Sequence, residues 1–556
     1  MYIGIMRRPA RRITDIVSIL VRYGFRDWLS SIHIRPRGLK KLKPGRSPRQ
    51  SRPERIRLAI EEMGPTFIKF GQLLSIRKDI IPQPYIRELS RLQDDVAPID
   101  SQEAKNILVE ELGSQYSILE FEEKPQASAS IAQVHRVTIS GYGEMAVKIQ
   151  RPGIEQIIEE DISILNWIAT QVEHYIPALR PLQPVNLVKE FAKTLRKELN
   201  FRVEAQNIIR FSRNFRNSKS IKVPRVYPDI STEKVLLMEF VHGQKLSRLL
   251  RDPERMTGEE RHRIARDGSR AIIDQVFIHA FFHADPHPGN ILVLPDNRLC
   301  FLDFGIMGQI SPSEQERLHQ AIISVTSNDY ERLAEIVLSL VGRSGDVDTD
   351  AFRTELFEII DQYINLPLEN IQVSTAVQEI FRIITNHHLI IPSKYLLMNK
   401  AIITIDGVAK ELEPGFTLAG LISTVVRKVL RQQFNPKRAR RTMVEITSDY
   451  ASLAKAFPRE SRDILSQLRQ GRLGILFKIE GIEPLRKTLD ELGSRLIYGI
   501  ILTAVLVSSS LIFSSGLPPL WKGVPVIGLA GFAIAGIMAL NYVLNLIRHY
   551  FRERWK

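Results

Sequence analysis

The chain has 556 residues, of which 44% are hydrophobic and 25% are charged, enough for several domains and a large buried core. This composition excludes wholesale disorder, a collagen-like repeat and a disulfide-stapled scaffold. The only cysteine in the sequence is Cys300, so an intrachain disulfide and any site made of several cysteines are excluded. Such sparse use of cysteine fits a reducing compartment.

The formal net charge of +15 is concentrated at the start of the chain, where residues 1–52 contain fourteen Lys and Arg against two acids. No secretory signal peptide is indicated, because charged residues interrupt the apolar stretch Ile13–Tyr23. The pattern predicts a basic arm over 1–54 with one amphipathic helix near Ile13–Leu29. This arm would be either solvated or bound to an anionic membrane surface, and we expect no nucleic-acid partner.

The periodicity of apolar residues then predicts an α+β chain with two lobes. The expected elements are a helical segment Arg55–Gln93 broken at Pro82 and Pro84, a hairpin of strands Ile131–Thr138 and Glu144–Gln150, helices Ile154–Tyr175 and Val185–Phe215, strands Val223–Tyr227 and Lys234–Val241, a helix over 258–282, and mostly helix over 312–424. The expected domains are a helical extension over 55–118, a two-lobed core over 119–425 and a basic amphipathic connector over 426–495.

The end of the chain has two charge-free runs, Leu496–Trp521 and Gly523–Ile547, each longer than the roughly 20 residues of a membrane-spanning helix. Lys522 and nearby prolines separate them, which predicts a transmembrane hairpin and basic tail over 496–556. Arg495 and four basic residues after the second run predict that both ends face the cytoplasm, as in a multi-pass protein of the inner membrane. A pair of buried core helices is the alternative. Small residues that would let the two helices pack are Gly528, Gly531, Ala535 and Gly536.

The strongest chemical signal is the loop His283–Asn290 together with an Asp-Phe-Gly that begins at Asp303. Asp285 precedes Asn290 by five residues, which is the spacing of a kinase catalytic loop. The segment between Asn290 and Asp303 is predicted to be a β-hairpin, which would bring these two residues to one edge. In phosphoryl transfer, Asn290 and Asp303 would hold Mg²⁺ on the phosphates of ATP, while Asp285 would be the catalytic aspartate at the acceptor.

A metal-binding face is an alternative interpretation, because His279, His283 and His287 repeat every four residues. Pro286 and Pro288 forbid a helix across the last pair, however. The phosphoryl-transfer interpretation is therefore favoured.

Lys148 ends an apolar strand, the position of the nucleotide-phosphate lysine in kinases, which a glutamate on the next long helix holds. Glu198 and Glu204 would point about 240° apart on one continuous helix, so only one of them can face Lys148. We expect Lys148 to pair with Glu198. Glu204 would then be available to Lys69, which with Gly71 and Gln72 forms a Lys-Phe-Gly-Gln string in the preceding helices.

An Ala- and Ser-rich segment, Ala127–Val134, occupies the place of the Gly-rich loop of ordinary kinases. Small residues still allow the backbone to approach phosphates, but alanine and serine lack the backbone freedom of glycine, so this loop should be stiffer. Adenine should meet the backbone near Glu239 and Val241, with Met238 behind it. The loop residues expected to contact ATP are Ala127, Ser128, Ala129, Ser130, Ile131, Ala132, Gln133 and Val134.

Taken together, these motifs resemble the UbiB/ADCK family of atypical kinases. The residues that carry the resemblance are Lys69–Gln72, Ala127–Val134, Lys148, Glu198-Leu199-Asn200, Glu204, Asp285–Asn290 and Asp303–Gly305. The resemblance implies a protein-kinase-like fold whose N-terminal helices cover the active site, with regulatory roles for Lys69, Gln72 and Glu204. It further implies ATP and Mg²⁺ as cofactors, ATPase activity, and a role in ubiquinone biosynthesis with quinone precursors and other biosynthetic proteins as partners. One motif departs from the family, since its Glu-x-Asp reads Glu-Leu-Asn here and ends at Asn200.

The sequence thus predicts a membrane-anchored, cytoplasm-facing atypical kinase or ATPase that supports ubiquinone biosynthesis. One alternative is a kinase for a small molecule or lipid. The other is a nucleotide-binding scaffold for a biosynthetic complex, which would need no turnover. The presence of Lys148, Asp285, Asn290 and Asp303 argues against the scaffold, because a purely structural pocket needs no metal-binding groups.

Overall fold

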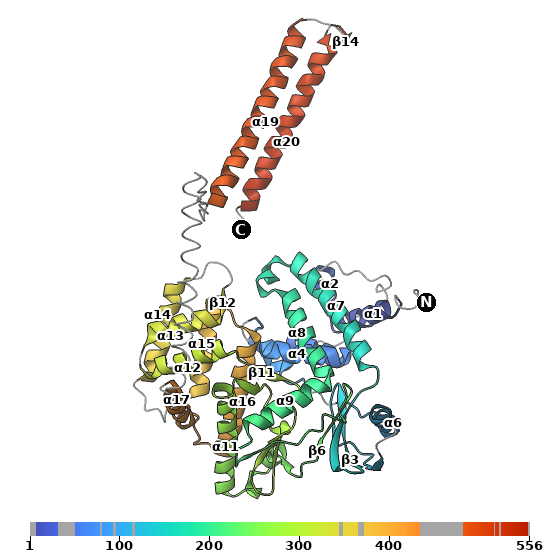
Figure 1. Ribbon diagram of the computed structural model, residues 1–556. Helices are drawn as coiled ribbons and strands as arrows, with labels where there is room; N and C mark the ends of the chain where they lie inside the picture. Colours follow the sequence, from blue (N-terminus) through green and yellow to red (C-terminus); the bar gives the residue numbers. More distant parts are fainter. Residues whose placement is uncertain are drawn as a thin grey trace, which may run out of the picture. The chain divides into compact units, whose positions relative to one another are not determined.

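The computed structural model describes residues 7–31, 50–77, 80–92, 96–113, 117–327, 329–343, 348–364, 372–433, 482–515, 518–521 and 524–553. The chain divides into two compact units, Met1–Arg440 and Arg441–Lys556. The first unit contains a strand-rich lobe, a helix-rich lobe and a set of N-terminal helices, and the described part of the second unit consists mainly of two long helices (Figure 1).

The strand-rich lobe is an antiparallel sheet in the order β1-β3-β4-β6, with β2 paired to β3. Its strands are β1 (Ile118–Phe121), β2 (Ala127–Ser128), β3 (Ala132–Ile139), β4 (Gly143–Gln150) and β6 (Val235–Glu239). One face of the sheet packs on α6 (Ser101–Leu112), where Leu108 and Met145 are fully buried. The predicted hairpin is therefore confirmed, and its register sets Lys148 opposite Val134.

Three helices connect β4 to the next strands. They are α7 (Ile154–Tyr175), α8 (Pro184–Leu199) and α9 (Phe201–Asn214), with the short 3₁₀ helix η2 (Pro177–Leu182) after α7. The bounds of α7 agree with the prediction. The prediction of one helix over Val185–Phe215 is wrong, because Asn200 adopts an extended backbone and its side chain accepts a hydrogen bond from the Arg202 amide. Asn200 is thus the N-cap of α9, a position that asparagine favours.

The helix-rich lobe has α11 and α16 packed against each other in its core. Its first elements are β5 (Ile221–Lys222), β7 (Gln244–Lys245), α10 (Leu246–Arg251), η3 (Pro253–Arg255), α11 (Gly258–Phe277), β8 (Phe281–His283), η4 (Pro288–Asn290), β9 (Ile291–Val293), β10 (Leu299–Phe301) and β11 (Met307–Gln309). The rest are α12 (Pro312–Thr326), α13 (Tyr330–Leu340), β12 (Gly342–Arg343), α14 (Thr349–Ile364), α15 (Val373–Asn386), β13 (Leu389–Ile390), α16 (Ser393–Leu412) and α17 (Ala419–Gln433).

Two predictions for this part of the chain are wrong in detail. The helix expected over 258–282 ends at Phe277, and Phe281–His283 forms a strand paired with β11. The strand expected over Val223–Tyr227 is reduced to a single bridge between Val226 and Met238. Phe281 and Phe282 are buried, and Val223, Val226 and Tyr227 are half-buried; in both places pairing with distant strands decides the backbone conformation.

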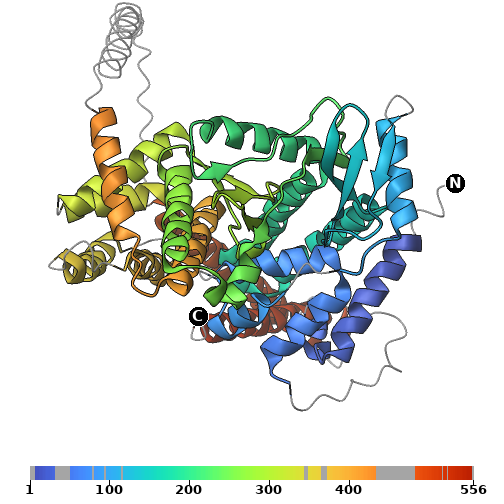
Figure 2. The ribbon, with the colours of Figure 1, turned by 90° about the horizontal axis from the view of Figure 1, so that it is seen from below.

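The N-terminal helices are α1 (Arg7–Arg22), α2 (Arg26–Ser31), α3 (Arg52–Met63), α4 (Pro65–Ser75) and α5 (Gln83–Leu89). They gather beside α7 and α8, as the blue helices of Figures 1 and 2 show. The apolar face of α1 is buried, with Ile16 and Val17 in the interior. Arg12 bonds to the buried Asp161 of α7 at 2.8 Å and to the Met63 carbonyl of α3 at 2.6 Å. The single helix expected near Ile13–Leu29 is thus two helices separated at Gly24, whose φ of 83° ends α1, and the apolar face of α1 packs on the protein itself.

The second unit contains α19 (Ile482–Ser515) and α20 (Val526–Glu553), joined through β14 (Leu520–Trp521) and β15 (Val524–Pro525). The two helices run side by side (Figure 1). A Cβ atom on Gly531 would lie 2.0 Å from Ser509 Oγ, and Ala535 is buried, so these small residues lie at the helix contact as predicted. Gly528 also lies at the contact, because a Cβ there would press against Phe513. A Cβ on Gly536 would meet nothing within 4 Å.

Among the described residues, Leu496–Ser515 is long and apolar enough to cross a membrane, and only 6% of its most apolar window is buried. Val526–Tyr542 is also apolar but shorter. The remaining parts of the membrane prediction fall outside the described residues: Lys522, residues 434–481 of the connector, and the last three residues.

Candidate active site

The hairpin of β9 and β10 brings Asn290 close to the start of the Asp-Phe-Gly segment, as the sequence predicts. The two strands pair antiparallel, and the Leu302 amide donates a hydrogen bond to the Asn290 carbonyl at 3.0 Å. The side-chain amide of Asn290 donates to the Asp285 carbonyl at 3.3 Å. This hydrogen bond from Asn290 Nδ2 holds the backbone of the catalytic loop in place. The other polar atom of the side chain, Oδ1, is an oxygen of the kind that Mg²⁺ prefers.

Asp303 is an ionised carboxylate that faces Lys148. Its Oδ1 lies 3.7 Å from Lys148 Nζ and accepts a hydrogen bond from the Gly305 amide at 3.0 Å. Partial burial disfavours the charged form, but the Lys148 ammonium and the Gly305 amide outweigh it and hold the pKa of Asp303 well below its ordinary value. The carboxylate is therefore charged at neutral pH, as a ligand for a hard cation must be.

His283 holds the backbone of the catalytic loop through hydrogen bonds. Its amide donates to Gln275 Oε1 at 2.8 Å, and its Nδ1 accepts from the Asp285 amide at 3.1 Å. Burial lowers the pKa of His283, which favours the neutral ring that this acceptor role requires. His287 Nδ1 likewise accepts from the Gly289 amide. These roles, and the absence of any cluster of three His, Cys, Asp or Glu among the described residues, do not support the metal-face alternative.

Two lysine–glutamate pairs lie beside this loop, and their partners are exchanged relative to the prediction. Lys148 Nζ donates to both oxygens of Glu204, at 2.8 and 3.0 Å. Lys69 Nζ donates to Glu198 Oε1 at 2.6 Å. The prediction assumed one continuous helix, but Asn200 interrupts it. Glu198 therefore lies in the last turn of α8 and Glu204 in the first turn of α9, so the angle between them on a single helix does not apply.

The Lys148–Glu204 pair is buried, so each of the two charges strongly affects the pKa of the other. Only 3% of the Glu204 side chain is exposed, and its Oε1 also accepts from the Phe304 amide at 3.3 Å. Burial disfavours the charged forms of both groups; it raises the pKa of Glu204, while Glu204 and Asp303 together raise the pKa of Lys148. The pair thus links β4, which carries Lys148, to α9 and to the Asp-Phe-Gly segment.

The helix α4 packs closely against its neighbours. The rings of Phe70 and Phe191 make an edge contact at 5.1 Å between α4 and α8. A Cβ on Gly71 would lie 2.4 Å from a methyl group of Leu92, so only glycine fits this close contact. Gln72 Nε2 donates to the Leu92 carbonyl at 3.2 Å. Lys69 and Phe70 of the string therefore hold α4 over α8, while Gly71 and Gln72 pack against Leu92.

The Ala-rich segment forms a tight hairpin turn from β2 into β3, closed by a 2.8 Å bond from the Ala129 amide to the Ala132 carbonyl. The side chain of Ser130 at this turn is fully buried, and its hydroxyl has no hydrogen-bond partner within the described part of the chain. An orphaned buried hydroxyl loses free energy unless a ligand or water satisfies it. Ser130 therefore fits a loop that receives phosphate oxygens.

Gln133 is placed differently from the rest of the predicted loop. It is fully buried on β3, on the opposite face from Val134, and its Oε1 accepts from the Ile99 amide at 2.8 Å. This side chain ties the sheet to the segment before α6. It is not directed to the face that bears Lys148.

Sequence reasoning missed Arg151, which holds the Ala-rich turn in place. Its Nε donates to the Ala129 carbonyl at 2.9 Å, and its Nη2 donates to Ser128 Oγ at 2.7 Å and to the Ala97 carbonyl at 2.9 Å. Its acceptors here are neutral oxygens, and burial lowers the pKa of Arg151. Arg151 follows Lys148 by three residues, so the sequence already places it near the lysine. Its partners lie too far along the chain to be inferred.

The end of β6 is the predicted contact for adenine. Glu239 is held by Lys222 at 2.8 Å and by the Arg225 amide at 3.0 Å. Its carboxylate is thus already paired within the protein, and the chain continues from Glu239 to Val241. Val241 packs against a small cluster that includes Cys300, whose burial raises the pKa of its thiol to about 12.

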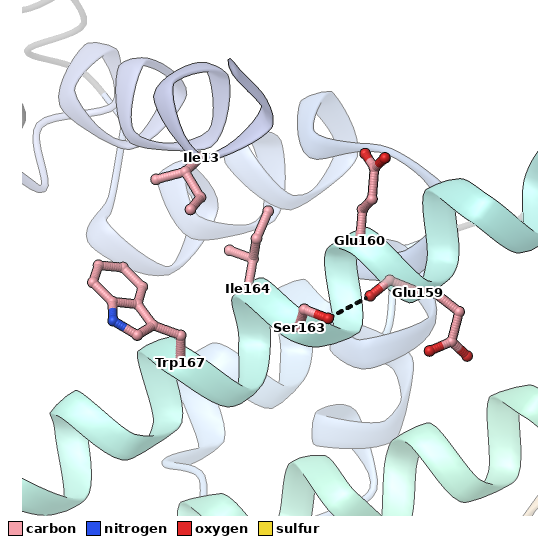
Figure 3. A pocket seen from close by; sticks show the side chains of 6 residues that line it. All are labelled: Ile13, Glu159, Glu160, Ser163, Ile164 and Trp167. Carbon is pink, nitrogen blue, oxygen red and sulfur yellow. Dashed lines mark hydrogen bonds between the residues drawn. The ribbon is translucent and has the colours of Figure 1, made fainter. Parts of the chain in front are cut away.

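A hollow lies between α1 and α7, apart from the residues described above (Figure 3). It has a volume of about 300 Å³ and is lined by Ile13, Glu159, Glu160, Ser163, Ile164 and Trp167. The Ser163 hydroxyl donates to the Glu159 carbonyl, and the Glu159 carboxylate pairs with Arg196. The surface of the hollow is mostly apolar, and of its two glutamates Glu159 is already paired with Arg196.

Comparison with protein families gives three consecutive matches. The ABC1 atypical kinase-like domain matches residues 91–337, the UbiB helical domain matches 356–417, and the ABC1/UbiB kinase-like C-terminal domain matches 480–548. The candidate active site and the paired C-terminal helices thus fall in separate family matches.

Similar proteins cover nearly the whole chain. The probable protein kinase UbiB of Xanthomonas axonopodis pv. citri is 33% identical, over 84% of this chain and 86% of its own. An uncharacterized protein in the hydrogenase 1 5′ region of Clostridium pasteurianum is 31% identical, over 97% of this chain and 98% of its own. Among solved structures, the complex of Rv3197 with erythromycin from Mycobacterium tuberculosis is 24% identical, with a TM-score of 0.38 over 64% of this chain and 94% of that chain.

Proposed function

Because the chain belongs to the ABC1/UbiB family of atypical kinase-like proteins, we propose that it is a membrane-anchored, ATP- and Mg²⁺-dependent kinase or ATPase that supports ubiquinone biosynthesis. One observation carries the proposal: the buried Lys148–Glu204 pair lies against the ionised Asp303. This arrangement provides a fixed ammonium for phosphate and a charged oxygen for a metal ion, as phosphoryl transfer requires.

The remaining groups of the site have matching roles. Asp303 and Asn290 would hold Mg²⁺, which when bound neutralises negative charge on the phosphates. Two protein oxygens are enough for this, because Mg²⁺ in such sites keeps waters and phosphate oxygens as its other ligands. Lys148 and the orphaned Ser130 hydroxyl would contact phosphates, and Asp285 would accept a proton from the nucleophile.

The helix α4 supports a regulatory role for Lys69, which holds Glu198 while α4 packs over α8. A covering helix at this place would restrict access for a protein substrate. Hydrolysis, or transfer to a small acceptor, is therefore the activity that we propose.

The membrane anchor is proposed from the exposed surface of the paired helices. Large apolar side chains on their outer faces are exposed, among them Leu496, Ile500, Leu511, Ile537 and Leu540. Water would disfavour such a surface, whereas the hydrocarbon core of a bilayer would not. We propose that α19 and α20 both enter the membrane, with the basic chain ends on the cytoplasmic side.

The test is phosphate release from the purified full-length protein with Mg·ATP, with and without anionic lipid vesicles or phenolic quinone precursors. We expect turnover, and we expect Asp303→Asn to reduce it by about 100-fold, because the variant removes a charged metal ligand. Asp296→Asn is the control, since Asp296 is an exposed aspartate on the same hairpin that pairs with Arg298.

Other outcomes separate the alternatives. Unchanged turnover in Asp303→Asn would contradict the metal assignment. Nucleotide binding without turnover in the wild type would favour a scaffold. Transfer of labelled phosphate to a lipid or to a phenolic precursor would identify a lipid or small-molecule kinase.

A further inference from the structure

A lysine from the helix-rich lobe reaches the proposed catalytic aspartate. Lys400 Nζ lies 2.9 Å from Asp285 Oδ1, with 36% of the lysine side chain and 43% of the aspartate side chain exposed. Lys400 belongs to α16, within the segment 356–417 that matches the UbiB helical domain. The contact therefore joins two separate family segments at one carboxylate.

The main chain of Asp285 is already fixed by its own loop. Its amide is bound by His283 Nδ1 and its carbonyl by Asn290 Nδ2. These bonds set the backbone, but the carboxylate can still rotate about its side-chain torsions. Among the contacts of the described residues, the ion pair with Lys400 is the one that selects an orientation of this carboxylate.

The loop itself has no cation for this task. The sequence His283–Asn290 contains no lysine or arginine, and His287 is engaged with the Gly289 amide. The two other lysines near the site each hold a glutamate, Lys148 with Glu204 and Lys69 with Glu198. The catalytic carboxylate thus receives its cation from α16.

The position of Lys400 is well defined, because α16 is anchored on both sides of it. Leu396, Ala401 and Ile405 on this helix are buried in the core that α16 shares with α11. A lysine next to such a buried row has its Cα fixed, so only its flexible stem needs to be ordered to reach Asp285.

We propose that Lys400 is a positioning residue for Asp285 in phosphoryl transfer, an inference that rests on the proposed function. Lys400 holds Oδ1, which directs Oδ2 to the nucleophile. When water attacks the γ-phosphorus, its oxygen forms the new bond to phosphorus, and the bond from phosphorus to the β–γ bridging oxygen breaks. The proton of the water passes to Asp285 Oδ2, and ADP leaves with the electron pair of the broken bond.

The test compares three variants of the full-length protein: Lys400→Met, Lys400→Arg and Lys410→Met. Lys410 is the matched control, because it lies on the same helix, is 38% exposed and pairs with Asp406 at 2.8 Å. We expect Lys400→Met to lower kcat for ATP hydrolysis about 10-fold to 100-fold, since loss of orientation at a reacting group has effects of this size. The KM for ATP and the affinity for Mg·ADP should stay within about twofold, Lys400→Arg should recover part of the loss, and Lys410→Met should resemble wild type.

A second arm uses Asp285→Asn as the background. If Lys400 acts through Asp285, adding Lys400→Met to that background should cost little further turnover, whereas a purely structural role would lower it as much as before. The inference is overturned if Lys400→Met keeps wild-type kcat. It is also overturned if nucleotide affinity falls as much as kcat and arginine restores nothing. Wild-type protein without any turnover would instead overturn the proposed function, so the two failures are distinct.

Discussion

Lys148 pairs with Glu204 and Lys69 pairs with Glu198, the reverse of the prediction. These two pairs belong to two separate groups of contacts in the site. Glu204 binds Lys148 and the Phe304 amide together, so the phosphate lysine and the Asp-Phe-Gly segment move as one. The Lys69–Glu198 pair joins α4 to α8 by a separate hydrogen bond, and the charge of Lys69 also contributes to the lowered pKa of Asp303. We therefore expect opening of α4 to leave the Lys148–Glu204 hydrogen bonds in place.

Double-mutant cycles test this division. We expect coupling of at least about 1 kcal/mol between Lys148→Met and Glu204→Gln, and between Lys69→Met and Glu198→Gln, in the free energy of unfolding. The crossed pair Lys69 with Glu204 should show a smaller coupling, within about 0.5 kcal/mol of additivity. A dominant coupling in the crossed pair would contradict the contacts described here.

Among the elements, those whose contacts are local in the chain could be predicted. The hairpin of β3 and β4 and the whole of α7 follow from apolar periodicity and from the glycines that flank them. The break at Asn200 could not, because apolar periodicity continues across it while the Phe201 amide bonds to the distant Glu233 carbonyl at 3.0 Å. The same reason hides the contacts of Arg151 and Lys400, whose partners lie far away in the sequence and are brought close by tertiary packing.

The contact between α19 and α20 depends on small residues at defined positions. A valine at Gly531 would force the helices apart, because its Cβ would overlap with Ser509. Gly536→Val is the control, since that position has open space. Tyr498 and Tyr542 stack with ring centroids 5.2 Å apart, so cysteines at these two positions can be joined by a short bifunctional thiol cross-linker. We expect the yield of cross-linking between them to fall several-fold in Gly531→Val and to persist in Gly536→Val; equal yields would show that Gly531 does not set the contact.

For the whole molecule, the boundary between the two compact units separates the candidate active site from the apolar helices. We expect a fragment of residues 1–440 to stay in the supernatant after centrifugation with vesicles at about 1 M salt, where electrostatic adhesion of its basic arm is screened. The full chain should remain with the vesicles, because burial of apolar helices is insensitive to salt. A fragment that still sediments at high salt would place a second membrane anchor before residue 440.

The burial of Cys300 has a practical consequence for spectroscopy. The chain has one thiol, which lies in the core and whose pKa is raised to about 12, so it reacts poorly with maleimides and other thiol reagents. Reporter groups can therefore be attached at engineered cysteines without first removing a native one. A pair of spin labels on the outer faces of α4 and α9 would measure, as a distance distribution, whether α4 moves when nucleotide is added.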